Sequence, residues 1–259
     1  MNETRKERWK QYWFVIRELT SREIKRKYAR SYLGIVWSVL NPLLTMAVMS
    51  LIFSTMFKNS IRNFPMYYLT GNLLWSMFTG ITNTTMTALV DNKTMLIKVR
   101  LPMAIFPLSR AYTSLVNFGY SLVAYIVMLL MFRIPWNAYT PLFLLYTVGV
   151  FCFSTGLGYI LSILYVHFGD IKHLWSVLLT LWMYMSALFY PVENLSPAMQ
   201  KVIRTNPVYV YINCARKAVL QGNAPEWGEW VQMIVWAIGM YLIGWFVFNY
   251  FKRGVMQKI

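Results

Sequence analysis

Six long apolar stretches, almost free of charged side chains, constrain this chain more than any other feature. They lie at about 33–57, 66–90, 105–132, 139–166, 173–191 and 230–251. A helix needs about 20 mostly apolar residues to cross the hydrocarbon core of a bilayer. Of the 259 residues, 58% are apolar and only 13% are charged, whereas about a quarter of a soluble domain is charged. The sequence therefore excludes a soluble enzyme and predicts six membrane-spanning helices.

The distribution of charge predicts the orientation of these helices. The chain carries 25 Lys and Arg against 9 Asp and Glu, an excess that is also typical of nucleic-acid-binding proteins. With six spans, 18 of the basic residues fall on the side of the two termini and 7 fall on the other side. Because basic residues concentrate on the cytoplasmic side of membrane proteins, we expect both termini in the cytoplasm and no nucleic acid as a partner.

Residues 1–32 form an arm of their own before the first span. Its apolar residues recur at helical spacing between Lys and Arg, which is typical of an amphipathic helix in the membrane interface. These apolar residues are Trp9, Tyr12, Trp13, Ile16 and Leu19. Thr20 and Glu23 match a capping box, so we expect a second helix to begin there and to run to about Arg30. The arm is interpreted either as a positive-inside anchor or as a docking element for a cytoplasmic partner.

The segment between the fifth and sixth spans predicts short helices. Ser196-Pro197 and Asn206-Pro207 are typical helix starts, with an N-cap residue followed by Pro at the first helical position. The helices expected at about 196–222 are too short to cross about 30 Å of hydrocarbon. We therefore predict an all-α integral membrane protein: an N-terminal interface helix, six transmembrane helices within 33–259, and short re-entrant helices on the outer side.

Several activities are disfavoured by what the sequence lacks. It contains no Gly-Lys pair and therefore no Walker A phosphate loop. None of its nine acids lies near the centre of a predicted span, although ion-coupled carriers usually keep a carboxylate there. Asp91 and Asp170 are not clustered as magnesium ligands are, and His167 and His173 beside Asp170 lack a third strong ligand. We predict no catalytic residue, no metal site and no cofactor bound by this chain.

The second predicted span is unusually polar, with 11 Thr, Ser, Asn and Gly residues between 70 and 87. Such residues hold membrane helices together, and they can equally line a wetted passage; both interpretations stay open. Aromatic residues make up 17% of the chain, and their flat apolar faces suit the C–H side of a sugar. The candidates for a glycan passage are Trp75, Thr79, Asn83, Tyr112, Asn117 and Tyr120.

One block of sequence carries a family resemblance. Residues 22–42, which read REIKRKYARSYLGIVWSVLNP, resemble the start of the permease subunits of bacterial ABC transporters of the type-two export family. This family includes exporters of teichoic acid, O-antigen and capsule. The similarity continues through Gly71, Trp75, Phe78, 92–102, 107–109, Trp182, 189–191, 206–207 and Arg216. Two positions depart from the pattern: Gly169, where Arg is common, and Ala187, where Pro is common. The second departure predicts a less kinked fifth span.

The resemblance implies a multi-pass protein of the bacterial cytoplasmic membrane that works as a dimer with two ATP-binding cassette subunits. ATP and magnesium would bind to those partner subunits. The implied substrate is a polysaccharide or teichoic acid linked to undecaprenyl diphosphate, in contact with membrane lipid. Contacts that couple the chain to the ATPase are then expected at Arg22, Lys25, Asp91, Asn92, Lys93, Lys98, Asp170 and Lys172.

Two further sets of residues follow from the same resemblance. The lipid diphosphate is expected to meet Tyr28, Arg30, Lys98 and Arg100, because Arg suits bidentate phosphate contacts; ordinary positive-inside charge is the alternative. An outer gate is expected at Tyr209, Tyr211 and Arg216. An ABC efflux permease for a small drug or lipid, and a membrane scaffold without transport, stay open as other functions. A membrane enzyme is opposed by the missing carboxylate cluster.

Overall fold

The computed structural model describes residues 2–29, 31–57, 61–98 and 101–258, without the side chains of residues 2–6, 256 and 257. Within these ranges the chain forms ten α-helices and no strand. The helices are α1 (Asn2–Tyr28), α2 (Val36–Phe53), α3 (Phe64–Asp91), α4 (Lys93–Lys98), α5 (Ile105–Met131), α6 (Leu142–His167), α7 (Ile171–Tyr184), α8 (Pro197–Thr205), α9 (Pro207–Arg216) and α10 (Trp227–Lys258). A 3₁₀ turn at Val192–Asn194 precedes α8, and a π-helical turn at Lys217–Gln221 follows α9.

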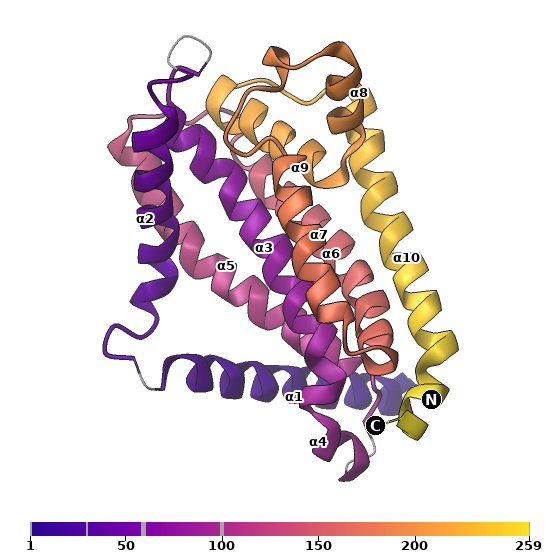
Figure 1. Cartoon of the computed structure of the whole chain (residues 1–259). Helices are drawn as coiled ribbons and strands as arrows, with labels where there is room; N and C mark the ends of the chain where they lie inside the picture. Colours follow the sequence, from indigo (N-terminus) through magenta and orange to yellow (C-terminus); the bar gives the residue numbers. More distant parts are fainter. Residues whose placement is uncertain (1, 30, 58–60, 99–100, 259) are drawn as a thin grey trace.

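The long helices form a bundle with α3 at its centre. Helix α3 packs against α2, α5, α6, α7 and α9, and α10 packs against α6. Helix α1 lies across one end of the bundle, and both termini lie at that end (Figure 1). Helices α8 and α9 lie at the opposite end. We refer to these as the α1 end and the α9 end.

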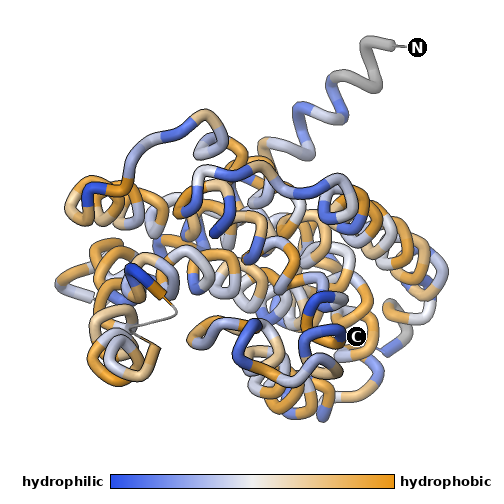
Figure 2. Tube along the Cα trace, turned by 90° about the horizontal axis from the view of Figure 1, so that it is seen from above, coloured by the Kyte–Doolittle hydropathy of each residue, from blue (hydrophilic) through white to orange (hydrophobic). Residues whose placement is uncertain are grey.

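The outer surface of the bundle suits a membrane. Apolar residues lie all round it when the bundle is viewed along its length (Figure 2), and many large apolar side chains are exposed, including Leu51, Val235 and Phe246. Four helices in the described part of the chain are long and apolar enough to cross a bilayer: α2, α5, α6 and the 227–255 part of α10. Helix α3 has the length, with 28 residues, and it carries the polar residues noted above.

The fifth predicted span is shorter than expected. Helix α7 has 14 residues, which span only about 21 Å at the rise of an α-helix. It ends at Tyr184, and the chain then turns through Ala187, whose φ of 46° is left-handed. The prediction of a less kinked fifth span is therefore wrong, because the helix stops before position 186 although no proline is present there.

The first helix differs from the prediction in another way. Helix α1 runs without a break from Asn2 to Tyr28, so the expected helix start at Thr20 is wrong. The Thr20 hydroxyl donates to the Ser109 carbonyl at 3.3 Å, and Glu23 faces α5, so both side chains serve tertiary contacts and not a cap. Ile16 and Leu19 are buried in a cluster with residues of α3, α5, α6 and α10, whereas Trp9 is exposed.

The short helices of the α9 end begin where the sequence predicts. Pro197 and Pro207 are their first residues, and the Asn206 side chain accepts a hydrogen bond from the Val208 backbone at 3.0 Å. Ser196 occupies the corresponding place before α8 without a side-chain bond. The segment ends at Gly222 with a φ of 69°, which glycine adopts at little cost.

The contact between α6 and α10 depends on two glycines. A Cβ atom on Gly156 would collide with the backbone of Met240, and one on Gly244 would collide with the backbone of Gly156. Small residues let membrane helices approach closely in this way. By contrast, a Cβ on Gly119 of α5 would meet no atom within 4 Å.

We predict that Gly156→Ala lowers the free energy of unfolding of the detergent-solubilised protein by about 1–3 kcal/mol, the usual cost of overpacking. Gly119→Ala serves as the matched control and should be neutral or slightly stabilising, because Ala is the better helix former. Thermal unfolding followed by size-exclusion chromatography measures both. Equal stability of the two variants would contradict the proposed helix contact.

Candidate functional site

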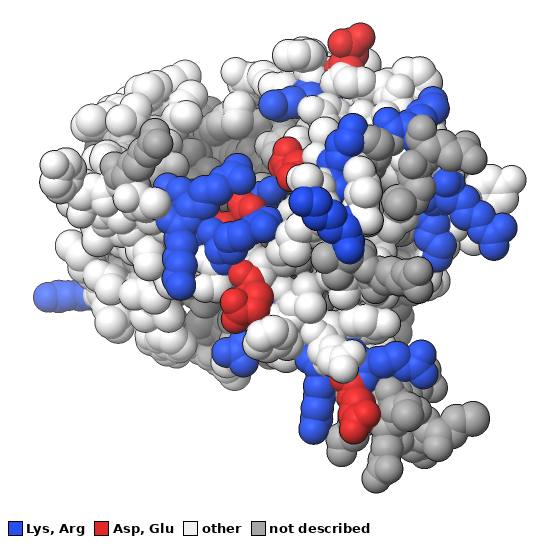
Figure 3. Space-filling model, turned by 90° about the horizontal axis from the view of Figure 1, so that it is seen from below, with Lys and Arg blue, Asp and Glu red and all other residues white. Residues whose placement is uncertain are grey.

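Basic side chains gather at the α1 end of the molecule. Viewed from that end, Lys and Arg side chains form a broad patch with a few Asp and Glu side chains between them (Figure 3). Helix α4 projects beyond α1 here (Figure 1). Lys93 and Lys98 at its two ends are exposed, as is Lys25 on α1. This end therefore presents a cationic surface to any partner that approaches it.

A buried arginine joins three helices just beneath this surface. Arg110, in the second turn of α5, places Nη1 2.7 Å from Glu23 Oε2 of α1 and Nη2 3.1 Å from Asp91 Oδ2 of α3. The side chains of Arg110 and Glu23 are each only 11% exposed. We call Glu23, Asp91 and Arg110 the Arg110 junction. A buried charge without a partner is strongly destabilising. The three side chains therefore hold the ends of α1, α3 and α5 in contact.

Further hydrogen bonds extend the junction along α1. Arg22 Nη2 donates to Asn92 Oδ1 at 2.9 Å, and the Asn92 amide in turn donates to the Ala88 carbonyl at 2.8 Å. On the other side, the Thr113 hydroxyl lies 3.3 Å from that of Thr20. Together these bonds hold α1 against the corner where α3 leads into α4.

The structure brings together part of the set predicted to meet an ATPase. Arg22, Asp91 and Asn92 lie in or beside the junction. The other members of the set are exposed at the same end: Lys25, Lys93, Lys98, Asp170 and Lys172. Sequence reasoning missed Glu23 and Arg110 as site residues. The signal was available, since Arg110 lies inside a predicted apolar span, where a charge needs a partner.

A polar groove of about 580 Å³ lies between α2 on one side and α3 and α5 on the other. Its polar lining consists of Ser38, Asn41, Thr45, Asn72, Ser76, Thr79, Thr84, Ser114, Asn117 and Ser121. Lys27 and Tyr28 of α1 line it as well. Both donate to Asn117 Oδ1, at 3.3 Å and 3.1 Å, and the Tyr28 hydroxyl also bonds to that of Ser38. The end of α1 is thus joined to α2 and α5 beside the groove.

Three of the six predicted passage residues line this groove: Trp75, Thr79 and Asn117. Asn83 is exposed and Tyr120 is half-buried, and neither lines the groove. Tyr112 instead packs edge-on against Trp13 of α1, with 5.1 Å between ring centroids. The structure therefore assembles half of the predicted set.

The polar residues of α3 divide between the two interpretations. Thr70, Thr82 and Thr85 are fully buried, and their hydroxyls donate to carbonyls one turn earlier in α3. This is helix packing, and the Thr85 side chain also leaves room only for glycine at position 158 of α6. Asn72, Ser76 and Thr79 face the groove instead. One side of α3 is thus used for packing and another forms a polar wall.

Two of the four residues expected to meet a diphosphate, Arg30 and Arg100, lie outside the described residues. Tyr28 is in the polar groove, where its hydroxyl has the partners given above. Lys98 is exposed at the end of α4.

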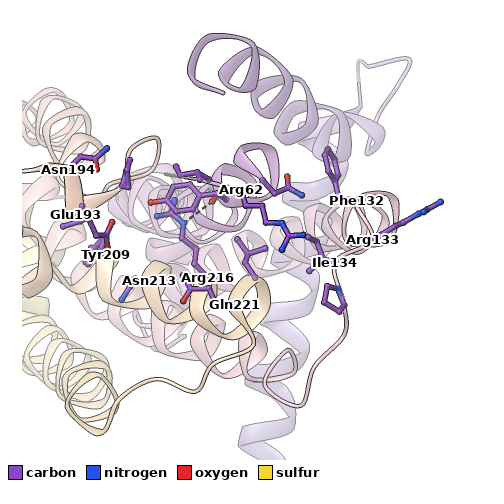
Figure 4. A pocket seen from close by; sticks show the side chains of 17 residues that line it. Arg62, Phe132, Arg133, Ile134, Glu193, Asn194, Tyr209, Asn213, Arg216 and Gln221 are labelled. Carbon is purple, nitrogen blue, oxygen red and sulfur yellow. Dashed lines mark hydrogen bonds between the residues drawn. The ribbon is translucent and has the colours of Figure 1, made fainter. Parts of the chain in front are cut away.

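A cavity of about 860 Å³ opens at the α9 end, and Arg216 forms part of its wall (Figure 4). Arg216 is only 4% exposed. Its guanidinium donates to the carbonyls of Tyr67 at 3.1 Å, Ala187 at 2.9 Å and Leu188 at 2.9 Å, and it lies 3.4 Å from the centre of the Tyr67 ring. Burial lowers the pKa of Arg216, but arginine remains charged in proteins.

Two of the three residues expected at an outer gate line this cavity. Tyr209 does so together with Arg216, and Glu193 lies on the same wall (Figure 4). Arg62 and Arg133 also line it, and the Arg133 side chain points outward from its edge (Figure 4). Tyr211 is buried, and its hydroxyl donates to the Met233 carbonyl of α10 at 2.6 Å. Tyr211 is therefore a packing residue in this structure.

Comparisons with known proteins agree on one family. The family described as "ABC-2 type transporter" matches residues 15–220. The O-antigen export system permease protein of Myxococcus xanthus is 32% identical over 83% of this chain and 84% of its own length. The capsule polysaccharide export inner-membrane protein of Neisseria meningitidis serogroup A is 25% identical over 93% of this chain and 92% of its own length. The polysialic acid transport protein of Escherichia coli is 21% identical over 82% and 83%.

We predict that Arg110→Gln destabilises the protein by about 3–5 kcal/mol, because it leaves the buried Glu23 carboxylate with only its longer ion pair to Arg22, at 3.7 Å. The exposed Lys98→Gln should change the stability by less than about 0.5 kcal/mol. Adding Glu23→Gln to Arg110→Gln should recover part of the loss, since the poorly compensated carboxylate is then removed. Thermal unfolding of the wild type, Glu23→Gln, Arg110→Gln and the double variant gives the coupling energy. Purely additive effects would contradict a direct ion pair.

Proposed function

Because the chain belongs to the ABC-2 type transporter family, we propose that it is the membrane subunit of an ATP-driven exporter of a lipid-diphosphate-linked polysaccharide. Members of this family are transmembrane subunits and not enzymes, and they imply ATPase partner subunits. The O-antigen, capsule and polysialic acid relatives support a polysaccharide as the cargo. Undecaprenyl diphosphate is the lipid carrier we propose, and teichoic acid remains among the candidate polymers.

We propose that α2, α3, α5, α6 and α10 cross the bacterial cytoplasmic membrane, with the α1 end inside. The remaining crossing is made by the 14-residue α7 together with the chain that follows it to Pro191. The basic surface at that end (Figure 3) supports this orientation, because basic residues favour the cytoplasmic side. Both termini lie at the same end (Figure 1). Helix α1 would then lie in the inner interface, with Trp9 exposed to lipid, and α8 and α9 would lie on the outer side.

The observation that carries the proposal is that one helix joins the cationic face to the polar groove. Helix α1 is held to the α3–α4 corner by the Arg110 junction and reaches the groove through Lys27 and Tyr28. An ATPase that moved α4 and α1 would therefore also act on the groove. The exposed Lys25, Lys93 and Lys98 are the proposed ATPase contacts on this face, and Asp170 and Lys172 in the α6–α7 turn are a second set.

We propose that the polar groove is one wall of the passage and that a second copy of the chain supplies the other. Helix α2 borders the groove, and only 11% of its membrane-span residues are buried inside the protein. Much of its surface is therefore available to such a partner. Ser76, Thr79 and Asn117 would hydrogen-bond sugar hydroxyls, and the Trp75 ring would contact their C–H faces. Tyr28 and Lys98, together with Arg30 and Arg100, remain the proposed contacts for the diphosphate.

The α9-end cavity is the proposed outer exit. Its wall combines the Tyr209 ring with polar groups of Glu193, Asn194 and Asn213, which suits a glycan. Arg216 holds α9 to α3 and to the segment after α7. It would therefore keep the backbone around the exit in place, while Tyr209 contacts the polymer.

Matched variants of two hydroxyl residues test the passage. Ser76 of α3 and Thr180 of α7 are both exposed, and each donates to a carbonyl one turn earlier in its helix, but only Ser76 lines the groove. In cells that lack the native gene, we predict that Ser76→Leu lowers cell-surface polysaccharide several-fold, whereas Thr180→Leu preserves it at equal expression. Normal export by Ser76→Leu would contradict the proposed passage.

Stimulation of ATPase activity in the reconstituted complex identifies the cargo class. Lipid-linked glycan should stimulate ATP hydrolysis and cationic drugs should not. Stimulation by small drugs or lipids alone would favour the alternative of an efflux permease, and the absence of any transport-coupled hydrolysis would favour a scaffold.

A further inference from the structure

A second groove at the α1 end lies between α10 on one side and residues 96–97 and 101–104 on the other. It has a volume of about 610 Å³. Its apolar lining consists of Leu96, Ile97, Leu101, Pro102, Met103, Ala104, Trp245 and Phe248. Its polar lining is confined to α10 and consists of Asn249, Lys252 and Arg253. We call this the α10 groove; the proposed passage, on the α2 side of the bundle, has no residue in common with it.

The charge of the α10 groove is entirely positive. None of the described residues that line it is acidic, and the ion pairs found in the described part of the chain do not include Lys252 or Arg253. Lys252 Nζ donates to Asn249 Oδ1 at 2.7 Å, which holds the ammonium group beside the groove. Arg253 is exposed and offers the forked geometry that binds phosphate.

The position of these residues along α10 matches the depth of a lipid headgroup. Lys252 is 25 residues beyond Trp227, or about 37 Å along the helix at its standard rise. With Trp227 at the outer interface, this distance exceeds the hydrocarbon core of about 30 Å and falls within the full bilayer of about 40–45 Å. Trp245 is about 27 Å from Trp227 by the same rise and stays at acyl-chain depth.

We propose that the α10 groove binds an anionic membrane phospholipid. Its phosphate contacts Lys252 and Arg253, and an acyl chain lies against Trp245, Leu101 and Met103. The assignment rests on the proposed function only in placing the α1 end at the cytoplasmic leaflet, where negative lipid headgroups attract basic residues. A phospholipid fits this site better than the polymer carrier, because α10 packs on α6 and α9 whereas the polar groove lies among α2, α3 and α5.

Such a lipid would act on the proposed coupling surface. Leu96 of α4 and Phe248 of α10 belong to one buried cluster with Ile16 and Leu19 of α1, and both line the α10 groove. A bound lipid therefore contacts the α4 segment and α10 together and steadies the corner that carries Lys93 and Lys98. We infer that anionic phospholipid raises the ATPase activity of the assembled transporter.

The test compares the purified transporter, with its ATPase subunits, in vesicles of phosphatidylcholine with and without phosphatidylglycerol. Native mass spectrometry reports retained lipid, and phosphate release reports ATP hydrolysis. The wild type should retain phosphatidylglycerol in preference to phosphatidylcholine and hydrolyse ATP faster in its presence. Lys252→Gln/Arg253→Gln should lose both effects. The matched control, Lys201→Gln/Arg204→Gln, removes two exposed charges from α8 at the other end and should keep both.

A second variant separates the loss of the site from misfolding. Ala104→Trp fills the α10 groove while keeping its charges, and it should also lose phosphatidylglycerol retention. Equal retention of the two lipids by the wild type, or unchanged retention by the charge variant, would overturn the proposal. Displacement by polyprenyl diphosphate without any preference for phosphatidylglycerol would assign the groove to the carrier and would equally overturn it. Lipid retention needs no polysaccharide, so its outcome is independent of the cargo.

Discussion

The Arg110 guanidinium lies between the carboxylates of Glu23 and Asp91, and the organisation of the α1 end depends on this arrangement. Removing a cation of this kind from water costs several kcal/mol unless carboxylates are close and well aligned. The chain meets that condition only when α1 lies against α5 and the end of α3 approaches both. Ile16 and Leu19 add apolar burial to the same contact. These contacts make α1, whose sequence also suits a simple membrane anchor, part of the bundle.

At the opposite end a second buried arginine works by different means. Arg216 donates to three backbone carbonyls, so it fixes the path of the chain without an ion pair to any described residue. Two of these carbonyls, from Ala187 and Leu188, belong to the turn in which Ala187 has a left-handed φ of 46°. A left-handed conformation costs an alanine roughly 1–2 kcal/mol, and the bonds to Arg216 offset that cost. The turn follows the end of α7 at Tyr184, and the chain beyond it, at 191–194, lines the α9-end cavity.

The features of the fold that could be predicted are those that depend on local residue patterns. The absence of charge located the long helices α2, α3, α5, α6 and α10, and it located the start but not the end of α7. Pro197 and Pro207 located the first residues of the short helices. What could not be predicted depends on contacts between distant residues. Thr20 has the sequence context of a helix cap, but its hydroxyl donates to the Ser109 carbonyl. The turn after α7 is bonded to Arg216, which is distant in sequence. For the site, the polar residues of α3 indicated a passage, yet only the fold decides which of them face the polar groove.

Helix α1 and the α3–α4 corner should move as one body and transmit motion to the polar groove. Electron paramagnetic resonance tests this with spin labels at Glu18 of α1 and Thr94 of α4, which are both exposed, and with a second pair at Val48 of α2 and Thr180 of α7. Each labelled chain would be diluted with unlabelled copies in the assembled transporter. We expect the first distance to be the same without nucleotide and with ATP trapped, while the second changes. A change in the distance between positions 18 and 94 on nucleotide trapping would contradict this coupling.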